Sequence, residues 1–434
     1  MEFQLKPGLL LGAASAATQI EGGDQNNNWY DWYRRGYVKD DADPSVATDH
    51  YARWQEDLSL MGAMGVQCCR LGIEWSRVEP EDGVFDETAI AHYREELQAL
   101  LDRGIRPLLT LHHFNNPLWL EERGGFANRD NITCYLLYVR KMVESFGDLV
   151  SEYITINEPN VYAFNGYFEG IWPPGKKSLL DMSRVMTNLA AAHIEAYGLI
   201  RKTRLQMGYR DTKVGFANHL RVFVPKDPAN PVHRFWASRT EQLFQGSLTR
   251  AMCLGRTAFP IGKHPSIVPG RYCDFHGVNY YTRSTVSGPA DGVAAGCVVN
   301  DLGWEIYPAG IVETARKVYD LLPRPIYITE NGTCDNEDRF RARYIAEHLQ
   351  AICKSDLPIE RYYHWCFCDN WEWVEGFTAR FGLVHVDFDT QERKVKHSGE
   401  FYRRVIAEGG VSEALYQAFC DAPYPVNAAE EDET

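Results

Sequence analysis

Two glutamates follow two similar apolar runs, and a pair of carboxyl groups can supply both acid/base and nucleophilic chemistry. Glu158 follows the run Tyr153-Ile-Thr-Ile-Asn157, and Glu330 follows Pro325-Ile-Tyr-Ile-Thr329. Runs of β-branched and aromatic residues bounded by turn signals are typical of buried strands in a parallel sheet. One such glutamate would be interpreted as a turn cap. A second copy of the arrangement favours a catalytic pair.

The elements that position this pair can be predicted from the alternation of strand-like and helix-like segments. Strands are predicted at 9–14, 66–73, 106–112, 153–158, 213–219, 274–281, 325–330 and 360–367. Helices are predicted at 45–64, 90–101, 132–150, 182–205, 234–251, 310–321, 339–354 and 398–407, with a Gly-rich segment at 284–303. Strand and helix units in this order predict an α/β fold, a single (β/α)8 TIM barrel with extended loops at the C-terminal face of the strands.

Glu158 and Glu330 would then end the fourth and seventh strands, on opposite sides of the barrel mouth. Catalytic groups of such barrels lie at this face. Carboxyl groups that converge across the mouth could lie about 5 Å apart, the separation used for retention in glycoside hydrolysis.

Both glutamate segments resemble the signature motifs of the family 1 glycoside hydrolases, the β-glucosidases and β-galactosidases. The motifs are Thr155-Ile-Asn-Glu-Pro159 and Ile328-Thr-Glu-Asn-Gly332. Segments 12–22, 70–77, 110–114, 172–175, 303–308 and 369–376 also resemble the family. The resemblance implies a retaining β-glycosidase that removes terminal β-D-glucosyl residues, and also β-galactosyl or β-fucosyl residues, through a covalent glycosyl-enzyme. It implies no cofactor and no metal.

The resemblance also implies a role for each matching residue. Glu330 would be the nucleophile, and Glu158 the general acid and later the general base. The residues implied to surround the nucleophile are Arg70, Asn279 and Tyr281, and those implied to hold the sugar are Gln19, His113, Asn157, Glu372 and Trp373. On the leaving-group side we expect Trp172, Trp304 and the 284–303 segment.

Elementary chemistry supports several of these roles. A guanidinium from Arg70 and a phenol from Tyr281 would favour the ionised form of Glu330, whereas Glu158 must hold a proton. Flat apolar faces suit a pyranose ring, so we expect Trp365 and Trp373 to stack on it and Phe381 and Trp119 to complete the wall. Taken alone, a strand tryptophan such as Trp365 is more often part of the core.

Composition limits the class of partner and the compartment. The formal net charge is −14 with scattered basic residues, which argues against nucleic acid and against an anionic membrane surface. Eleven cysteines without a Cys-x-x-Cys pair indicate reduced thiols and the cytoplasm.

We expect no secretory signal and no membrane span. Residues 1–425 are expected to form the barrel and 426–434 a short disordered acidic tail; homo-oligomer formation is left open.

Two alternatives stay open. A catalytically weak sugar-binding or transglycosylating member of the same fold would share most of these residues. A metal-dependent barrel hydrolase would need a ligand cluster at the strand ends, where only His113 and His219 qualify. For the substrate, the Glu372-Trp373 pair favours an unmodified small β-glycoside or oligosaccharide, because a carboxylate there would repel a 6-phosphate.

Overall fold

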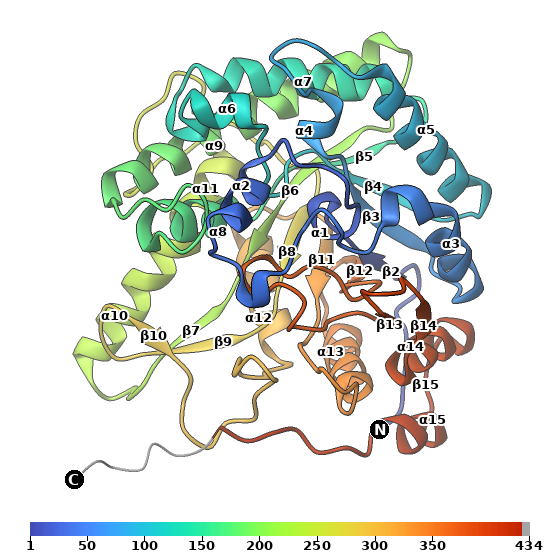
Figure 1. The fold of residues 1–434 in the computed structure, drawn as a ribbon. Helices are drawn as coiled ribbons and strands as arrows, with labels where there is room; N and C mark the ends of the chain where they lie inside the picture. Colours follow the sequence, from blue (N-terminus) through green and yellow to red (C-terminus); the bar gives the residue numbers. More distant parts are fainter. Residues whose placement is uncertain (428–434) are drawn as a thin grey trace.

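Eight parallel strands close into a barrel at the centre of the molecule, and helices surround it (Figure 1). The computed structural model describes residues 1–427. In order around the barrel the strands are β2 (Leu10–Ala14), β3 (Cys68–Gly72), β4 (Arg106–Thr110), β5 (Glu152–Asn157), β6 (Lys213–His219), β8 (His276–Asn279), β11 (Ile326–Asn331) and β12 (Ile359–Trp365). Strand β12 pairs with β2 and closes the ring. The predicted (β/α)8 fold is confirmed.

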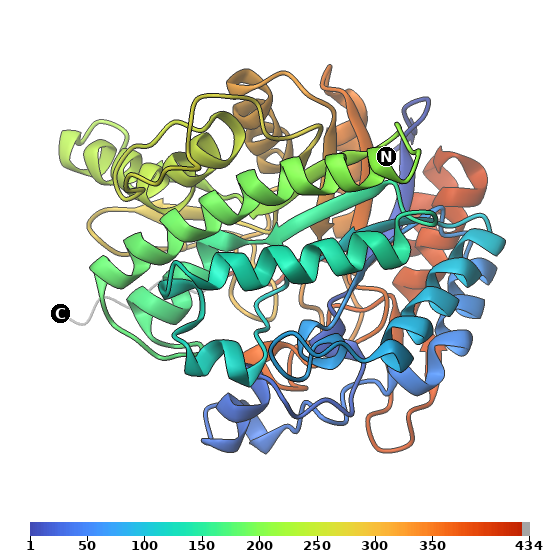
Figure 2. The same ribbon diagram turned by 90° about the horizontal axis from the view of Figure 1, so that it is seen from above.

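The helices of the outer ring bury one face each against the barrel. They are α3 (His50–Ala63), α5 (Glu87–Asp102), α7 (Asn131–Phe146), α9 (Leu179–Gln206), α11 (Ser247–Leu254), α12 (Gly310–Leu321), α13 (Arg341–Lys354) and α14 (His397–Glu408). In α7, Tyr135, Val139 and Met142 keep helical spacing and are fully buried. Figure 2 shows α7 and the longer α9 side by side across one flank of the barrel.

Loops after the strands carry short helices that build the walls of the barrel mouth. These are α1 (Ala17–Ile20), α2 (Asn28–Arg34), η1 (Lys39–Asp41), α4 (Trp75–Val78), α6 (Leu118–Glu122), η2 (Gly125–Ala127), α8 (Pro159–Ala163), η3 (Phe164–Glu169) and η5 (Trp373–Glu375). The sequence pattern did not predict them, because elements of three to seven residues are too short to show a hydrophobic period.

Several predicted elements differ from the structure. The helix predicted at 234–251 is divided into α10 (Pro231–Glu241), the π-turn η4 (Gln242–Gly246) and α11. The Gly-rich 284–303 segment contributes β9 (Arg283–Val286) and β10 (Asp291–Gly292), which form a small sheet with β7 (Val222–Pro225). The helix predicted from residue 45 starts at His50, because 45–48 form turns and Asp49 has a φ of 51°.

The two ends of the described chain are tied to the barrel domain. Strand β1 (Phe3–Gln4) pairs with β15 (Gly410–Val411), and α15 (Glu413–Phe419) follows. A hairpin of β13 (Val384–Val386) and β14 (Arg393–Val395) precedes α14. Of the predicted acidic tail, Val426 forms a bridge to Val298, and residues 428–434 lie outside the described residues.

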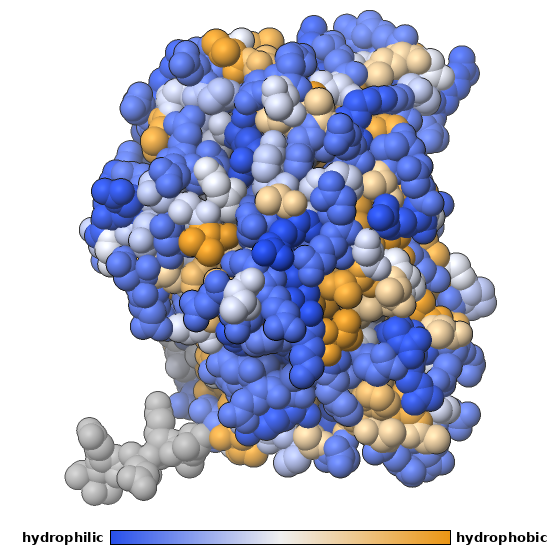
Figure 3. Space-filling model, turned by 45° about the vertical axis from the view of Figure 1, so that its right-hand side comes forward, coloured by the Kyte–Doolittle hydropathy of each residue, from blue (hydrophilic) through white to orange (hydrophobic). Residues whose placement is uncertain are grey.

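The face in Figure 3 is mostly hydrophilic, with hydrophobic residues in small separate patches. In residues 1–427, no helix combines the length and the apolar character that a bilayer crossing requires. The eleven cysteines, all of which lie in this part of the chain, are free.

A buried charged cluster joins α3, α5 and β14. The ring of His50 lies between two carboxylates, with Nδ1 at 2.7 Å from Asp57 and Nε2 at 2.8 Å from Glu96. Arg393 adds a contact of 3.0 Å to Asp57. Burial alone would lower the pKa of His50, but Glu96 and Asp57 raise it to about 10. The cluster therefore holds a buried imidazolium at neutral pH.

Candidate active site

The predicted catalytic residues line one cavity at the C-terminal ends of the barrel strands. The cavity has about 590 Å³ of space and opens to solvent. Its lining residues come from most of the strand ends and loops: His113, Phe114, Glu158, Val161, Asn165, Trp172, His219, Arg221, Tyr281, Trp304, Glu330, Trp365, Glu372, Trp373 and Phe381. Polar groups that converge in an apolar, aromatic cavity are typical of a ligand site.

Glu158 lies just beyond the strand that was predicted to end on it. Strand β5 ends at Asn157, and Glu158 precedes α8 with Pro159 at the first helical position. The backbone of Glu158 has a φ of 40°, a left-handed conformation that costs a non-glycine residue about 1 kcal/mol or more. Its N–H donates to the carbonyl of Ala217 at 2.7 Å. This strained turn directs the carboxyl into the mouth.

One oxygen of the Glu158 carboxyl is held by two protein donors. Asn279 Nδ2 donates to Oε1 at 2.8 Å, and His219 Nδ1 lies 3.2 Å from the same oxygen. Arg221 Nε donates to His219 Nε2 at 2.9 Å, so the proton of the neutral ring is on Nδ1. Burial lowers the pKa of His219, which keeps the ring neutral. Both donors use Oε1 and leave Oε2 to the cavity.

Glu330 is held on both oxygens. It is the second-last residue of β11, which ends at Asn331, one residue beyond the strand end that was predicted. The guanidinium of Arg70 forms an ion pair with Oε1, and the hydroxyl of Tyr281 donates to Oε2 at 2.6 Å. Burial raises the pKa of Glu330 to about 7; Arg70 opposes this, and the charge of Glu158 adds to it. The predicted partners of Glu330 are thus present, but burial raises its pKa by more than they lower it.

A network of amides fixes these groups relative to one another. Asn157 Oδ1 accepts from Arg70 at 2.6 Å and from Asn279 at 3.0 Å. Asn157 Nδ2 lies 2.9 Å from His113 Nε2, so that nitrogen accepts and Nδ1 of His113 carries the proton. In the described part of the chain this Nδ1 has no hydrogen-bond partner. Burial lowers the pKa of His113 well below its usual value, which leaves a neutral donor in the cavity wall.

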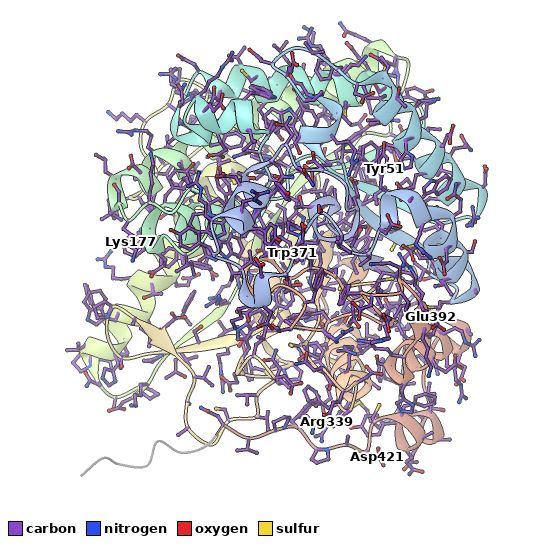
Figure 4. All side chains as sticks on the ribbon, in the orientation of Figure 1. Tyr51, Lys177, Arg339, Trp371, Glu392 and Asp421 are labelled. Carbon is purple, nitrogen blue, oxygen red and sulfur yellow. The ribbon has the colours of Figure 1, made fainter. Side chains whose placement is uncertain are left out.

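Gln19 lies behind Glu372 and does not line the cavity. Its Nε2 donates to the carbonyl of Trp371 at 2.9 Å and to Glu372 Oε2 at 3.2 Å. Trp371, labelled near the centre of Figure 4, donates from its indole to the carbonyl of Ala42 at 3.0 Å. Burial raises the pKa of Glu372 to about 8, and the charge of Glu330 acts in the same direction. The carboxyl of Glu372 is therefore mostly protonated at pH 7.

Aromatic rings form the walls as predicted, except for Trp119. The ring of His113 lies between Trp365 and Trp373, 5.8 Å from each centroid. On the outer side, Phe381 and Trp304 are 6.0 Å apart. The sequence prediction placed Trp119 in this wall, but its indole donates to the carbonyl of Glu79 at 2.9 Å and lies outside the cavity lining.

The sequence analysis missed His219 and Arg221 as functional candidates of this cavity. It considered His219 only as a metal ligand. His219 ends the fifth predicted strand, and strand ends of a barrel face the mouth, so this signal was present in the sequence. Arg221 contacts Asp291 of the Gly-rich segment at 3.3 Å, a contact between distant segments that no local pattern predicts.

Comparisons with known proteins agree with this geometry. The family model described as Glycosyl hydrolase family 1 matches residues 1–411. Beta-glucosidase A of Thermotoga maritima is 32% identical over 94% of this chain and 98% of its own length. A beta-galactosidase of Pyrococcus woesei is 28% identical over 94% and 98%.

Solved structures of similar proteins superimpose over nearly the whole chain. A beta-glycosidase from Pyrococcus horikoshii has a TM-score of 0.86 and 33% identity, covering 96% of this chain and 98% of its own. The beta-glucosidase from Thermotoga maritima in complex with glucoimidazole has a TM-score of 0.88 and 30% identity, covering 94% and 100%.

Proposed function

Because the chain belongs to glycosyl hydrolase family 1, we propose that it hydrolyses terminal, non-reducing β-D-glucosyl residues of small β-glycosides with retention of configuration. The observation that carries the proposal is the pair of buried carboxyls in one cavity, each with different neighbours. Glu330 is bound on both oxygens, whereas Glu158 keeps one oxygen free for a substrate. A nucleophile and a proton donor need this difference.

In the first step, a carboxylate oxygen of Glu330 attacks the anomeric carbon. The bond from that carbon to the leaving-group oxygen breaks, and Glu158 transfers a proton to this oxygen. We assign the proton to Oε2, because Asn279 and His219 already bind Oε1. The Arg70 ion pair and the Tyr281 hydrogen bond favour the ionised form of Glu330 as the sugar enters.

In the second step, Glu158 is ionised and accepts a proton from water while the water oxygen attacks the anomeric carbon. The ester bond to Glu330 breaks and the carboxylate is regenerated. The product carries the same anomeric configuration as the substrate, since two displacements restore it.

Unpartnered polar atoms near the cavity suit the hydroxyls of a sugar. Gln19 Oε1 and His113 Nδ1 are both buried and lack partners among residues 1–427. His113 Nδ1 and the carboxyl of Glu372 line the cavity and offer donors and acceptors to neighbouring hydroxyls, while Gln19 holds Glu372 from behind. Trp365 and Trp373 supply the flat faces of the wall. These groups suit glucosyl, galactosyl and fucosyl residues alike.

Glu372 alone repels a 6-phosphate less than its sequence position suggests. Burial raises its pKa to about 8, so the carboxyl carries little negative charge at pH 7. The preference for an unmodified sugar now rests on the whole set of carboxyls, Glu158, Glu330 and Glu372, since a phosphate dianion beside them would be repelled or would force their protonation.

We also propose that the protein works in the cytoplasm and without nucleic acid. The eleven free cysteines suit a reducing compartment. The net charge of −14 opposes binding to a polyanion.

The roles of the two glutamates are separated by substrates with good and poor leaving groups. Glu330→Ala should abolish turnover of both while the circular dichroism spectrum is unchanged. Glu158→Ala should lower kcat for an alkyl β-glucoside about 10²- to 10⁴-fold, but affect the glycosylation step of a dinitrophenyl β-glucoside far less.

Glu375→Ala serves as the control, because Glu375 is in the same mouth loops but pairs with Lys39 at the surface. Equal losses on both substrates in Glu158→Ala would contradict the acid assignment. A wild-type protein that binds glucosides without turnover would favour the sugar-binding alternative, and activity lost to a chelator would favour the metal-dependent one.

A further inference from the structure

A cluster of potential metal ligands lies at the opposite end of the barrel from the catalytic cavity. Cys253 is near the end of α11, Cys273 precedes β8, and His276 is the first residue of that strand. Asn279, which donates to Glu158, is the last residue of the same strand. The cluster is therefore separate from Glu158 and Glu330, and the proposed hydrolysis does not use it.

Three potential ligand atoms converge in this cluster. The two thiol sulfurs are 3.8 Å apart, and Cys253 Sγ is 3.9 Å from His276 Nδ1. The ligand atoms of all three residues lie within 4.8 Å of one another. Two thiolates bound to one zinc ion at Zn–S distances of about 2.3 Å would be about 3.8 Å apart across a tetrahedral angle. The observed sulfur separation therefore needs no rearrangement to hold such an ion.

The histidine is oriented as a metal ligand would be. His276 Nε2 lies 2.6 Å from the carbonyl of Leu322, so the ring proton is on Nε2 and the lone pair of Nδ1 points to the sulfurs. A hydrogen bond from the non-ligating nitrogen to a carbonyl is the usual support of a metal-binding imidazole.

Burial and charge select the kind of ion. Cys253 and Cys273 are fully buried and His276 is 3% exposed. Two thiolates and a neutral imidazole balance a divalent cation, which avoids the cost of a net charge in the interior. Thiolate and imidazole ligands suit Zn²⁺, whereas Ca²⁺ and Mg²⁺ prefer oxygen.

We propose that Cys253, Cys273 and His276 bind one Zn²⁺ that joins α11 to the start of β8. Binding replaces the two thiol protons, which leave to solvent, by two Zn–S bonds and adds one Zn–N bond. No fourth histidine, cysteine or carboxylate of residues 1–427 joins the cluster, so the fourth position of the ion falls to water or a backbone carbonyl. The ion has a structural role, because no part of the catalytic cavity reaches it.

The metal content of the purified full-length protein tests this proposal. Protein from zinc-supplemented cultures is dialysed against a chelator, and bound zinc is measured by mass spectrometry. We expect about one zinc per chain in the wild type and a loss of at least tenfold in the Cys253→Ala, Cys273→Ala double variant. Cys420→Ala is the matched control, because Cys420 is buried elsewhere and should leave the zinc content unchanged. Equal zinc in wild type and double variant would overturn the proposal.

A second measurement does not depend on the folding of a variant. Wild-type crystals give diffraction data on both sides of the zinc absorption edge. An anomalous peak between the two sulfurs and His276 Nδ1 supports the site, and a featureless map there overturns it. Neither result depends on glycosidase activity, so failure of this inference leaves the proposed function untouched.

Discussion

His219 Nδ1 lies 3.2 Å from Glu158 Oε1, and Arg221 Nε donates to the other ring nitrogen of the same histidine at 2.9 Å. The guanidinium fixes the tautomer of His219, and the histidine then donates to the carboxylate. With Asn279, the histidine holds Oε1, so Glu158 presents Oε2 to the leaving group.

Replacement of His219 by leucine should lower kcat for an alkyl β-glucoside about tenfold, because Glu158 loses one of the two donors that position its carboxyl. A dinitrophenyl β-glucoside, whose leaving group needs little acid assistance, should lose far less. Phe244→Leu is the packing control, since its ring contacts His219 without a polar group. Equal losses in both variants would count against the assignment.

The two catalytic carboxyls should titrate as a coupled pair. Burial raises the pKa of Glu330 to about 7, with a contribution from the charge of Glu158. In Glu158→Gln this charge is absent and the hydrogen bond from Asn279 can remain, so the pKa of Glu330 should fall. The measurement is the pH dependence of covalent labelling of Glu330 by an activated 2-fluoro glucoside, which needs no acid. The acidic limb should move to lower pH; a limb that moves upward would contradict the coupling.

Glu372 should contribute to sugar binding but lower the stability of the folded protein as pH rises. Its pKa is raised by burial to about 8, above the 4.5 of an exposed glutamate, so the folded protein binds more protons and its stability falls as pH rises through this interval. Glu372→Gln should therefore raise the melting temperature at pH 8 and remove part of this slope. It should also lower kcat/KM at least about a hundredfold, as expected for lost hydrogen bonds to sugar hydroxyls.

Glu375→Gln is the control for Glu372, because that glutamate is on the same loop and contacts Lys39 at the surface. Both quantities should stay near wild type there. A Glu372→Gln protein with wild-type kcat/KM would remove Glu372 from the sugar site.

The buried imidazolium of His50 should make the protein lose stability in mild alkali. Its folded pKa of about 10 exceeds the usual 6.5, owing to Glu96 and Asp57, so its contribution is complete below pH 6.5 and is lost as pH rises toward 10. His50→Gln should destabilise the protein by about 3 kcal/mol or more at pH 6, since the buried Glu96 loses its cation and Asp57 keeps only Arg393. Urea unfolding at several pH values, with the exposed His397→Gln as control, measures both effects. An unchanged pH slope in His50→Gln would refute this account.

The barrel and most of its site could be predicted from the sequence for a simple reason. Several barrel strands are short apolar runs with a polar residue at the carboxyl end, as in Glu152–Asn157 and Ile326–Asn331, and eight strands in order leave few alternative topologies. The position of a residue on a strand end then places its side chain at the mouth. Glu158 and Glu330 were predicted in this way, whereas Asn279 was implied by the family resemblance.

The rest depends on contacts that no local pattern contains. Arg221 contacts His219, two positions away in the sequence, and Asp291, seventy positions away. Only the folded loops bring Asp291 to Arg221. Trp119 follows a strand as the other wall residues do, but its indole is bound to Glu79. The raised pKa of Glu372 follows from burial by loops from distant parts of the chain, which sequence spacing does not specify.

The most direct measurement of the central claim is the configuration of the sugar at the moment of release. Hydrolysis of an aryl β-glucoside is followed by proton nuclear magnetic resonance. The enzyme concentration is high enough that hydrolysis is faster than mutarotation of the released sugar. Two displacements at Glu330, assisted by Glu158, predict β-glucose as the first product, with the α-anomer appearing later. The α-anomer as the first product would contradict the account.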